Sequence, residues 1–103
     1  MKERILRKLF LGFMQVHILY HAQKEPIYGV CMIEELKEHG YDISAGTLYP
    51  LLHSLSTGGL LAKEEQVIGG KIRKYYTITP AGEDVLKEAS KKAEELVREL
   101  KEN

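Results

Sequence analysis

The sequence has almost no cysteine and no long apolar run. Cys31 is the single cysteine among 103 residues, which excludes an internal disulfide framework and predicts a reducing, cytoplasmic location. No apolar stretch reaches the roughly 18 residues that a membrane span needs. The N-terminal segment is charged and amphipathic, without the apolar core of a signal peptide. We therefore expect a cytoplasmic protein with no membrane partner.

The chain also lacks an excess of charge of either sign. Fifteen basic and 15 acidic residues cancel, so net charge does not indicate a nucleic-acid partner. The cancellation is uneven, however, since residues 1–79 hold ten Lys and Arg against eight Asp and Glu. Residues 80–103 hold five basic against seven acidic residues. The first segment could therefore present a local positive face.

Residue sets that usually carry catalysis are missing too. The sequence shows no paired carboxylates, no nucleophile with a partnered base and no phosphate-binding glycine loop. We predict neither an enzyme nor a bound cofactor.

Two helices are predicted in the first 40 residues. The segment 2–23 has an apolar sector that looks too wide for one small domain to cover, so part of it is expected to face a second chain. The segment 28–39 is shorter, with Val30 and Leu36 among its inward residues, and Gly40 is well placed to end it in a left-handed conformation.

A third helix is predicted over residues 44–57. Ser44 is a good N-cap, because its hydroxyl can accept a hydrogen bond from the backbone N–H groups of the first turn. Leucines at helical spacing form one apolar face, and Thr47, Tyr49 and His53 lie off it, on a surface suited to contact. With the preceding helix and the short glycine-containing link, this helix forms a helix-turn-helix arrangement.

Two strands, over residues 60–67 and 72–79, are predicted to form a hairpin. Gly69-Gly70 supplies the positive-φ residues of its turn. Three cations stand within four residues at the tip, beside aromatic residues, and this pattern suits phosphate contact. The alternative is solubilising charge on an edge strand. The residues concerned are Lys71, Arg73, Lys74 and Tyr75.

A last helix is predicted to begin at Pro80, with Thr79 as its cap. Its apolar residues alternate in steps of three and four, which is a heptad seam over two repeats. We predict a homodimer built from this helix and the first one, although the helix could instead fold back on its own domain. The predicted interface comprises Leu6, Phe10, Phe13, Leu86, Ala89, Ala93, Leu96 and Leu100.

These elements describe a winged helix-turn-helix, a mainly α fold with a small β-hairpin (α+β). We divide it into a DNA-binding domain, 1–79, and a dimerisation helix, 80–103. The residues resemble those of the PadR-like family of transcriptional regulators, in its short form with a single C-terminal helix. The matching stretches are Pro26-Ile27-Tyr28-Gly29, Ile43-Ser44-Ala45-Gly46-Thr47-Leu48-Tyr49-Pro50-Leu51-Leu52, Gly58-Gly59-Leu60-Leu61, Gly70-Lys71-Ile72-Arg73-Lys74-Tyr75-Tyr76 and Thr77-Ile78-Thr79-Pro80-Ala81-Gly82.

The resemblance implies a dimeric repressor that binds double-stranded DNA. The helix 44–57 would enter the major groove and the hairpin would lie on the backbone. A dimer of this kind reads a pseudo-palindromic operator whose half-sites lie about 10 base pairs, or a multiple of that, apart. The predicted DNA-binding residues are Ser44, Thr47, Tyr49, His53, Lys71, Arg73, Lys74 and Tyr75.

The resemblance also implies a small hydrophobic or aromatic effector, bound where the first and last helices meet. Aromatic and methionine side chains opposite small alanines would leave room for a flat ligand. The alternative is that these residues only fill the dimer core. The residues proposed for the effector are Phe13, Met14, His17 and Ala93.

Two other functions stay open. The chain could be a winged-helix module that binds proteins, because a fold does not fix a function. It could also be a metal-responsive regulator, since His17 and His21 are four residues apart on one helix and Cys31 and His39 lie elsewhere in the chain. No metal site is predicted, because two histidines without a dense cluster are usually packing or surface residues.

Overall fold

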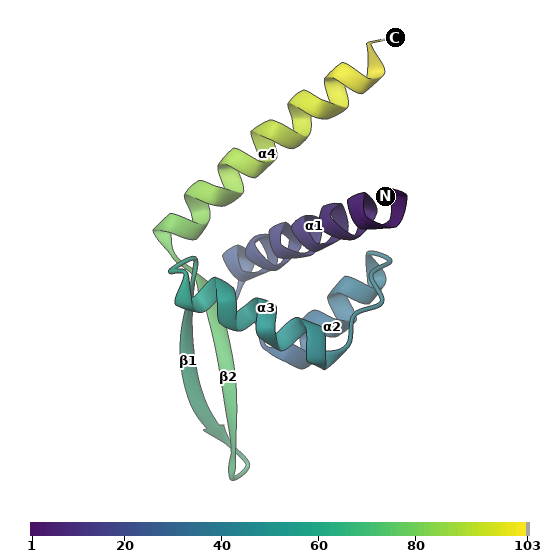
Figure 1. The fold of residues 1–103 in the computed structure, drawn as a ribbon. Coiled ribbons are helices and arrows are strands. Elements are labelled where there is room, and N and C mark those ends of the chain that lie inside the picture. The colour runs from purple at the N-terminus through teal and green to yellow at the C-terminus, as the bar shows by residue number, and fades with distance from the viewer. Residues whose placement is uncertain (103) are drawn as a thin grey trace.

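The computed structural model describes residues 1–102, which form four helices and a two-stranded antiparallel sheet (Figure 1). The predicted winged helix-turn-helix is confirmed, and the bounds of each element differ from the prediction by one or two residues. Asn103, the last residue of the predicted dimerisation segment, lies outside the described residues. The elements are α1 (Lys2–Lys24), α2 (Gly29–Glu38), α3 (Ala45–Thr57), β1 (Leu61–Ile68), β2 (Lys71–Ile78) and α4 (Pro80–Lys101).

One apolar core lies among α1, α2 and α3, and the base of the hairpin closes it. Ile18, Met32 and Leu48, one from each helix, are 0% exposed. The fully buried side chains of α1 all lie in the second half of that helix. The buried apolar side chains are Met14, Ile18, Leu19, Ala22, Ile27, Met32, Leu36, Ile43, Leu48, Leu52, Leu55, Leu61 and Tyr76.

Gly40 sets the conformation of the link between α2 and α3, as predicted. Gly40 has a φ of +90°, in the left-handed region that side chains rarely adopt. Its N–H donates to the Lys37 carbonyl at 3.0 Å, and the Tyr41 N–H donates to the Leu36 carbonyl at 2.9 Å. This pair of bonds is a Schellman motif, which ends α2 and turns the chain toward α3.

The start of α4 is held against the end of α3. Thr79 caps α4 as predicted, because its hydroxyl oxygen accepts from the Gly82 N–H at 3.0 Å. The same hydroxyl donates to the Gly59 carbonyl at 2.6 Å. A Cβ atom at Gly82 would collide with the Leu60 carbonyl oxygen, so only glycine permits this close approach. From there α4 runs antiparallel to α1 and diverges from it toward the free ends (Figure 1).

One local prediction holds only in part and another is wrong. Ser44 is the N-cap residue of α3 as predicted, but its hydroxyl makes no capping hydrogen bond; Ser44 Oγ instead lies 3.4 Å from Thr47 Oγ1. Val30 is 58% exposed, and Met32 takes the inward position on α2. Residues 30–33 are all apolar, so their pattern could not show which of them the other helices would cover.

None of the helices in residues 1–102 is long and apolar enough to cross a membrane.

Candidate nucleic-acid interface

Helix α3 separates its buried and exposed residues along two faces. Leu48, Leu52 and Leu55 are buried in the common core, where α3 packs on α2 and β1. Thr47, Tyr49 and His53 lie on the exposed side, as the spacing predicted. The core therefore holds α3 in place and leaves these three polar side chains available to a partner.

The hairpin is attached to the helical part through the segment between α1 and α2. The Ile27 N–H donates to the Tyr76 carbonyl at 2.9 Å, and the Tyr76 N–H donates to the Ile27 carbonyl at 2.8 Å. At the other end, Gly69 and Gly70 turn the chain with φ values of +60° and +79°. The hairpin base is thus fixed beside the start of α2, and its tip extends away from the core (Figure 1).

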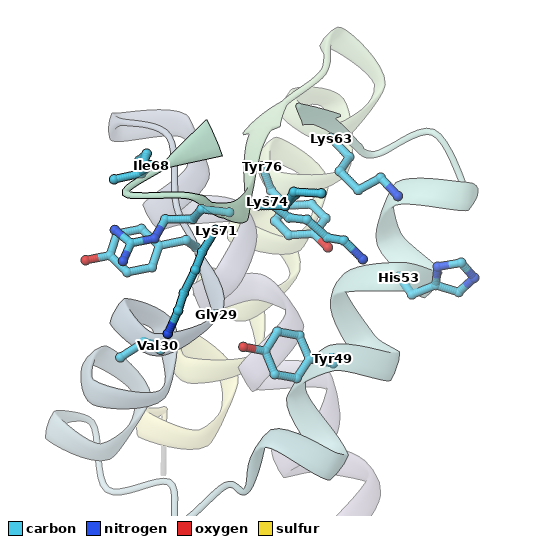
Figure 2. Close-up of a pocket in the computed structure, with 12 residues that line it drawn as sticks. Gly29, Val30, Tyr49, His53, Lys63, Ile68, Lys71, Lys74 and Tyr76 are labelled. Atoms are coloured by element: carbon cyan, nitrogen blue, oxygen red, sulfur yellow. The ribbon is translucent and has the colours of Figure 1, made fainter. Parts of the chain in front are cut away.

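A cleft of about 580 Å³ lies between the hairpin, α3 and the start of α2 (Figure 2). Five of the predicted DNA-binding residues line it: Tyr49, His53, Lys71, Arg73 and Lys74.

The cleft contains a fourth cation, Lys63 on β1, which was not among the residues predicted from the sequence. It stands opposite Tyr76 in the hairpin, and strand pairing is the signal that could have found it. Lys63 and Lys74 lie on the side of Tyr49 and His53, whereas Lys71 extends toward Val30 on α2 (Figure 2).

The cations occupy both faces of the hairpin, because side chains alternate along a strand. Lys63 and Lys74 share one face and Lys71 and Arg73 share the other. Glu64 on β1 adds negative charge opposite Tyr75. Within residues 1–102, none of the four cations is part of an ion pair, although Glu65 stands opposite Lys74 on the paired strand.

Arg73 is held by two tyrosines. Its guanidinium lies 4.5 Å from the centre of the Tyr28 ring, a cation–π distance. Hydrogen bonding with the Tyr75 side chain raises the pKa of Arg73 above its ordinary value. The rings of Tyr28 and Tyr75 pack edge to face, with their centres 5.6 Å apart. Tyr75, which does not line the cleft, thus positions a cation that does.

Tyr49 has a structural contact as well as an exposed surface. Its ring and hydroxyl lie so close to Gly29 that a Cβ there would be 2.5 Å from Tyr49 Oη. Gly29 therefore lets the outer face of α3 pack against the first turn of α2. Ser44 and Thr47 are also exposed but lie outside the cleft, at the start of α3.

A second concave surface, of about 670 Å³, lies between α1 and α4. Phe13, Leu86, Ala89, Ala93 and Leu96 of the predicted dimer interface line it, whereas Leu6, Phe10 and Leu100 are exposed outside it. For the predicted effector site, the structure brings together Phe13, His17 and Ala93 but not Met14, which is buried in the core. Burial and the neighbouring imidazoles of His39 and His21 lower the pKa of His17.

The sequence of this chain matches the model of the transcriptional regulator PadR-like family over residues 18–88. The match covers the start of α4 as well as the helix-turn-helix and the hairpin, which build the cleft. The chain belongs to the PadR-like family of transcriptional regulators.

A curated relative is similar to this regulator over most of its length. The transcriptional regulator Rv3488 of Mycobacterium tuberculosis is 42% identical over 95 residues, which are 92% of this chain and 89% of that protein.

Solved structures of PadR-like proteins share the fold. A PadR family transcriptional regulator from Eggerthella lenta is 34% identical with a TM-score of 0.80, covering 98% of this chain and 93% of that one. A PadR-like transcription factor from Bacteroides fragilis is also 34% identical, with a TM-score of 0.82 and coverage of 94% and 95%. PadR-like regulators bind DNA and are typically dimeric, and they are not typically enzymes.

Proposed function

We propose that this PadR-like regulator is a dimeric repressor that binds a specific double-stranded operator and is released by a small hydrophobic or aromatic effector. The observation that carries the proposal is the cleft beside α3. Four hairpin cations that form no ion pair within residues 1–102 line it, together with Tyr49 and His53 on the exposed face of α3. Cations position a protein on the phosphate backbone, and polar side chains on a helix read base edges in the major groove.

In this arrangement α3 enters the major groove and the hairpin follows the backbone. Ser44, Thr47, Tyr49 and His53 face the bases, and the hairpin cations neutralise phosphates, with Arg73 held in place by Tyr75. Residues 1–79 form the DNA-binding domain. Two such domains related by a two-fold axis read a pseudo-palindrome with half-sites about 10 base pairs, or a multiple of that, apart.

The dimer is proposed to form through α1 and the helix in 80–103. Leu96 is 53% exposed and Leu100 is 69% exposed, and both lie on the heptad seam of α4. Leu6 and Phe10 are exposed on α1 as well. Apolar side chains in such number on two neighbouring helices are typical of an interface between chains.

The DNA proposal is tested by selecting bound duplexes from a random pool and then measuring affinity against salt. We expect an enriched pseudo-palindrome and an affinity that falls linearly with salt on logarithmic axes. A protein that enriches no sequence and shows no salt-dependent affinity for duplex DNA would instead be a protein-interaction module.

The effector proposal rests on the surface between α1 and α4. Phe13, His17 and Ala93 line it, and a flat ligand could stack on the two rings. We expect a panel of planar hydrophobic compounds to contain a ligand that binds wild type and releases DNA. Ala93→Leu should fill the space and weaken that binding. Equal binding by Ala93→Leu, or no ligand in the panel, would show a packed interface without an effector site.

A further inference from the structure

Three of the four histidines gather where α1 passes the C-terminal end of α2. His17 and His21 are one turn apart on α1, and His39 is the C-cap residue of α2. One ring nitrogen from each lies within 4.8 Å of the others. The rings of His17 and His39 stack with their centres 4.3 Å apart, and the centres of His21 and His39 are 5.7 Å apart. The spacing in the sequence placed His17 and His21 on one face of a helix, and the fold brings His39 beside them.

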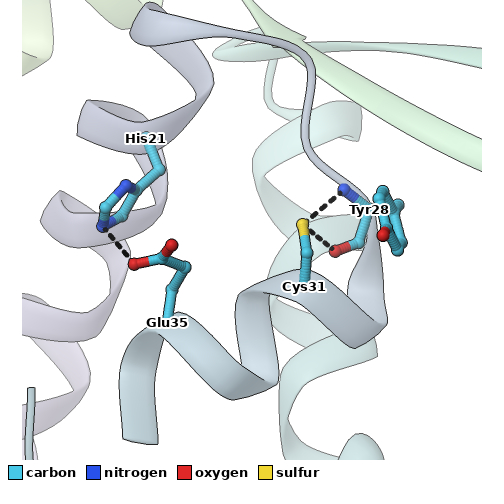
Figure 3. Close-up of polar contacts among 4 residues, drawn as sticks. All are labelled: His21, Tyr28, Cys31 and Glu35. Carbon is cyan, nitrogen blue, oxygen red and sulfur yellow. Dashed lines mark hydrogen bonds and ion pairs between the residues drawn. The ribbon is translucent and has the colours of Figure 1, made fainter. Parts of the chain in front are cut away.

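A carboxylate completes the group. Glu35 Oε2 lies 3.8 Å from His21 Nε2 (Figure 3). That nitrogen is buried and has no hydrogen-bond partner among the described residues. A buried polar atom without a partner is costly, and natural structures contain few of them. A ligand that accepts the nitrogen lone pair would satisfy this atom.

The location also favours positive charge. The carbonyl groups at the C-terminal end of a helix carry a partial negative charge, and His39 stands at that end of α2. Glu35 lies one turn earlier on the same helix. A cation placed among the three imidazoles would therefore interact favourably with both the carboxylate and the helix end.

We propose that His17, His21 and His39, with Glu35, bind one divalent transition-metal ion of the Zn²⁺ type per chain. Imidazole nitrogens suit Zn²⁺, whereas Mg²⁺ and Ca²⁺ require oxygen ligands. Three nitrogens at tetrahedral Zn²⁺ distances lie about 3.3 Å from one another, closer than the present spacing. The exposed His39 side chain can turn to reach that geometry, and Glu35 or a water takes the fourth position.

An ion bound there would connect two parts of the molecule. His17 and His21 belong to the helix proposed for dimerisation, and His39 and Glu35 belong to the first helix of the helix-turn-helix. His17 and His39 also line the surface between α1 and α4. The metal would fix the angle between α1 and α2 and would border the proposed effector site without being part of the DNA-binding cleft.

The experiment is a calorimetric titration of the tag-free, chelator-treated protein with Zn²⁺ in the absence of DNA. We expect one ion per chain. His39→Ala should weaken binding by roughly 100-fold or more, since residues that only orient a ligand already contribute about 10- to 100-fold. His53→Ala is the matched control, because His53 is the remaining histidine and lies on α3 outside the cluster. The control should bind as wild type does.

Two further measurements keep the test decisive. Co²⁺ should give the visible absorption of a tetrahedral nitrogen site in wild type and His53→Ala but not in His39→Ala. Zn²⁺ should raise the thermal unfolding midpoint of the same two proteins only, because an ion that binds the native state stabilises it. Equal Zn²⁺ affinity in wild type and His39→Ala, or loss of binding in His53→Ala, overturns the proposal whether or not the protein binds DNA.

Discussion

The two halves of helix α1 lie in different surroundings. In the second half Met14, Ile18 and Leu19 are buried by α2, α3 and the hairpin. In the first half Ile5, Leu6, Leu9 and Phe10 are exposed although they are equally apolar. One continuous amphipathic helix therefore serves the domain's own core at one end and leaves an apolar surface uncovered at the other.

The same division applies to α4. Its first turn is fixed to Leu60 and Gly59, whereas every residue from 90 to 102 is exposed. The radius of gyration is 15.0 Å, compared with about 13 Å for a compact chain of this length. The winged half thus has its own core, whereas the arm, formed by the first half of α1 and the second half of α4, leaves its apolar side chains exposed. In the proposed dimer a second chain buries them.

A charge in the arm gives the largest effect expected from this comparison. Leu96→Glu would place an unpaired carboxylate in the dimer seam twice, at a cost of about 3–5 kcal/mol each. Sedimentation at micromolar concentration should show a dimer for wild type and a monomer for the variant. Lys91→Glu, at a position of the same helix outside the heptad seam, should remain dimeric. A monomeric wild type would show that no second chain of this protein buries the arm.

A core substitution tests the other half. Leu52→Ala should lower the free energy of unfolding by about 2–5 kcal/mol, because Leu52 is fully buried and a cavity would remain. Denaturant unfolding measures this loss. Leu100→Ala, made in the monomeric Leu96→Glu background, should change stability by less than about 0.5 kcal/mol. Similar losses at both positions would mean that the arm is packed within its own chain.

Within the winged half, base contacts and phosphate contacts can be separated. Thr47→Ala should change discrimination at one base pair of the half-site by about 1–3 kcal/mol and leave affinity for unrelated DNA unchanged. Binding to operators with single base-pair changes measures this. An unaltered ranking of the operators would remove Thr47 from the residues that read sequence.

The smallest effect is expected for a single hairpin cation. Lys74→Ala should weaken binding to all sequences alike and lower the slope of log K against log salt by about one per chain. Lys87→Ala, a cation on α4 away from the cleft, is the control. If the slope does not change in the Lys74 variant, this face of the hairpin does not contact phosphate.

Much of the fold was predictable because its signals are local. Gly40 ends α2, Thr79 caps α4 and Gly69-Gly70 turns the hairpin, each through bonds or backbone angles within a few residues. The exposed face of α3 followed from helical spacing alone. The prediction was wrong where the local pattern did not distinguish buried from exposed positions. Val30 is the example, because it lies in a run of four apolar residues.

The sequence by itself determined the order of the elements, the cations of the returning strand and the apolar excess of the two terminal helices. Tertiary structure decided which groups meet: Arg73 over Tyr28, and His39 with His17 and His21. These pairs are separated by up to 45 residues, so no spacing along the chain encodes them. They follow from the packing of α1, α2, α3 and the hairpin around one core.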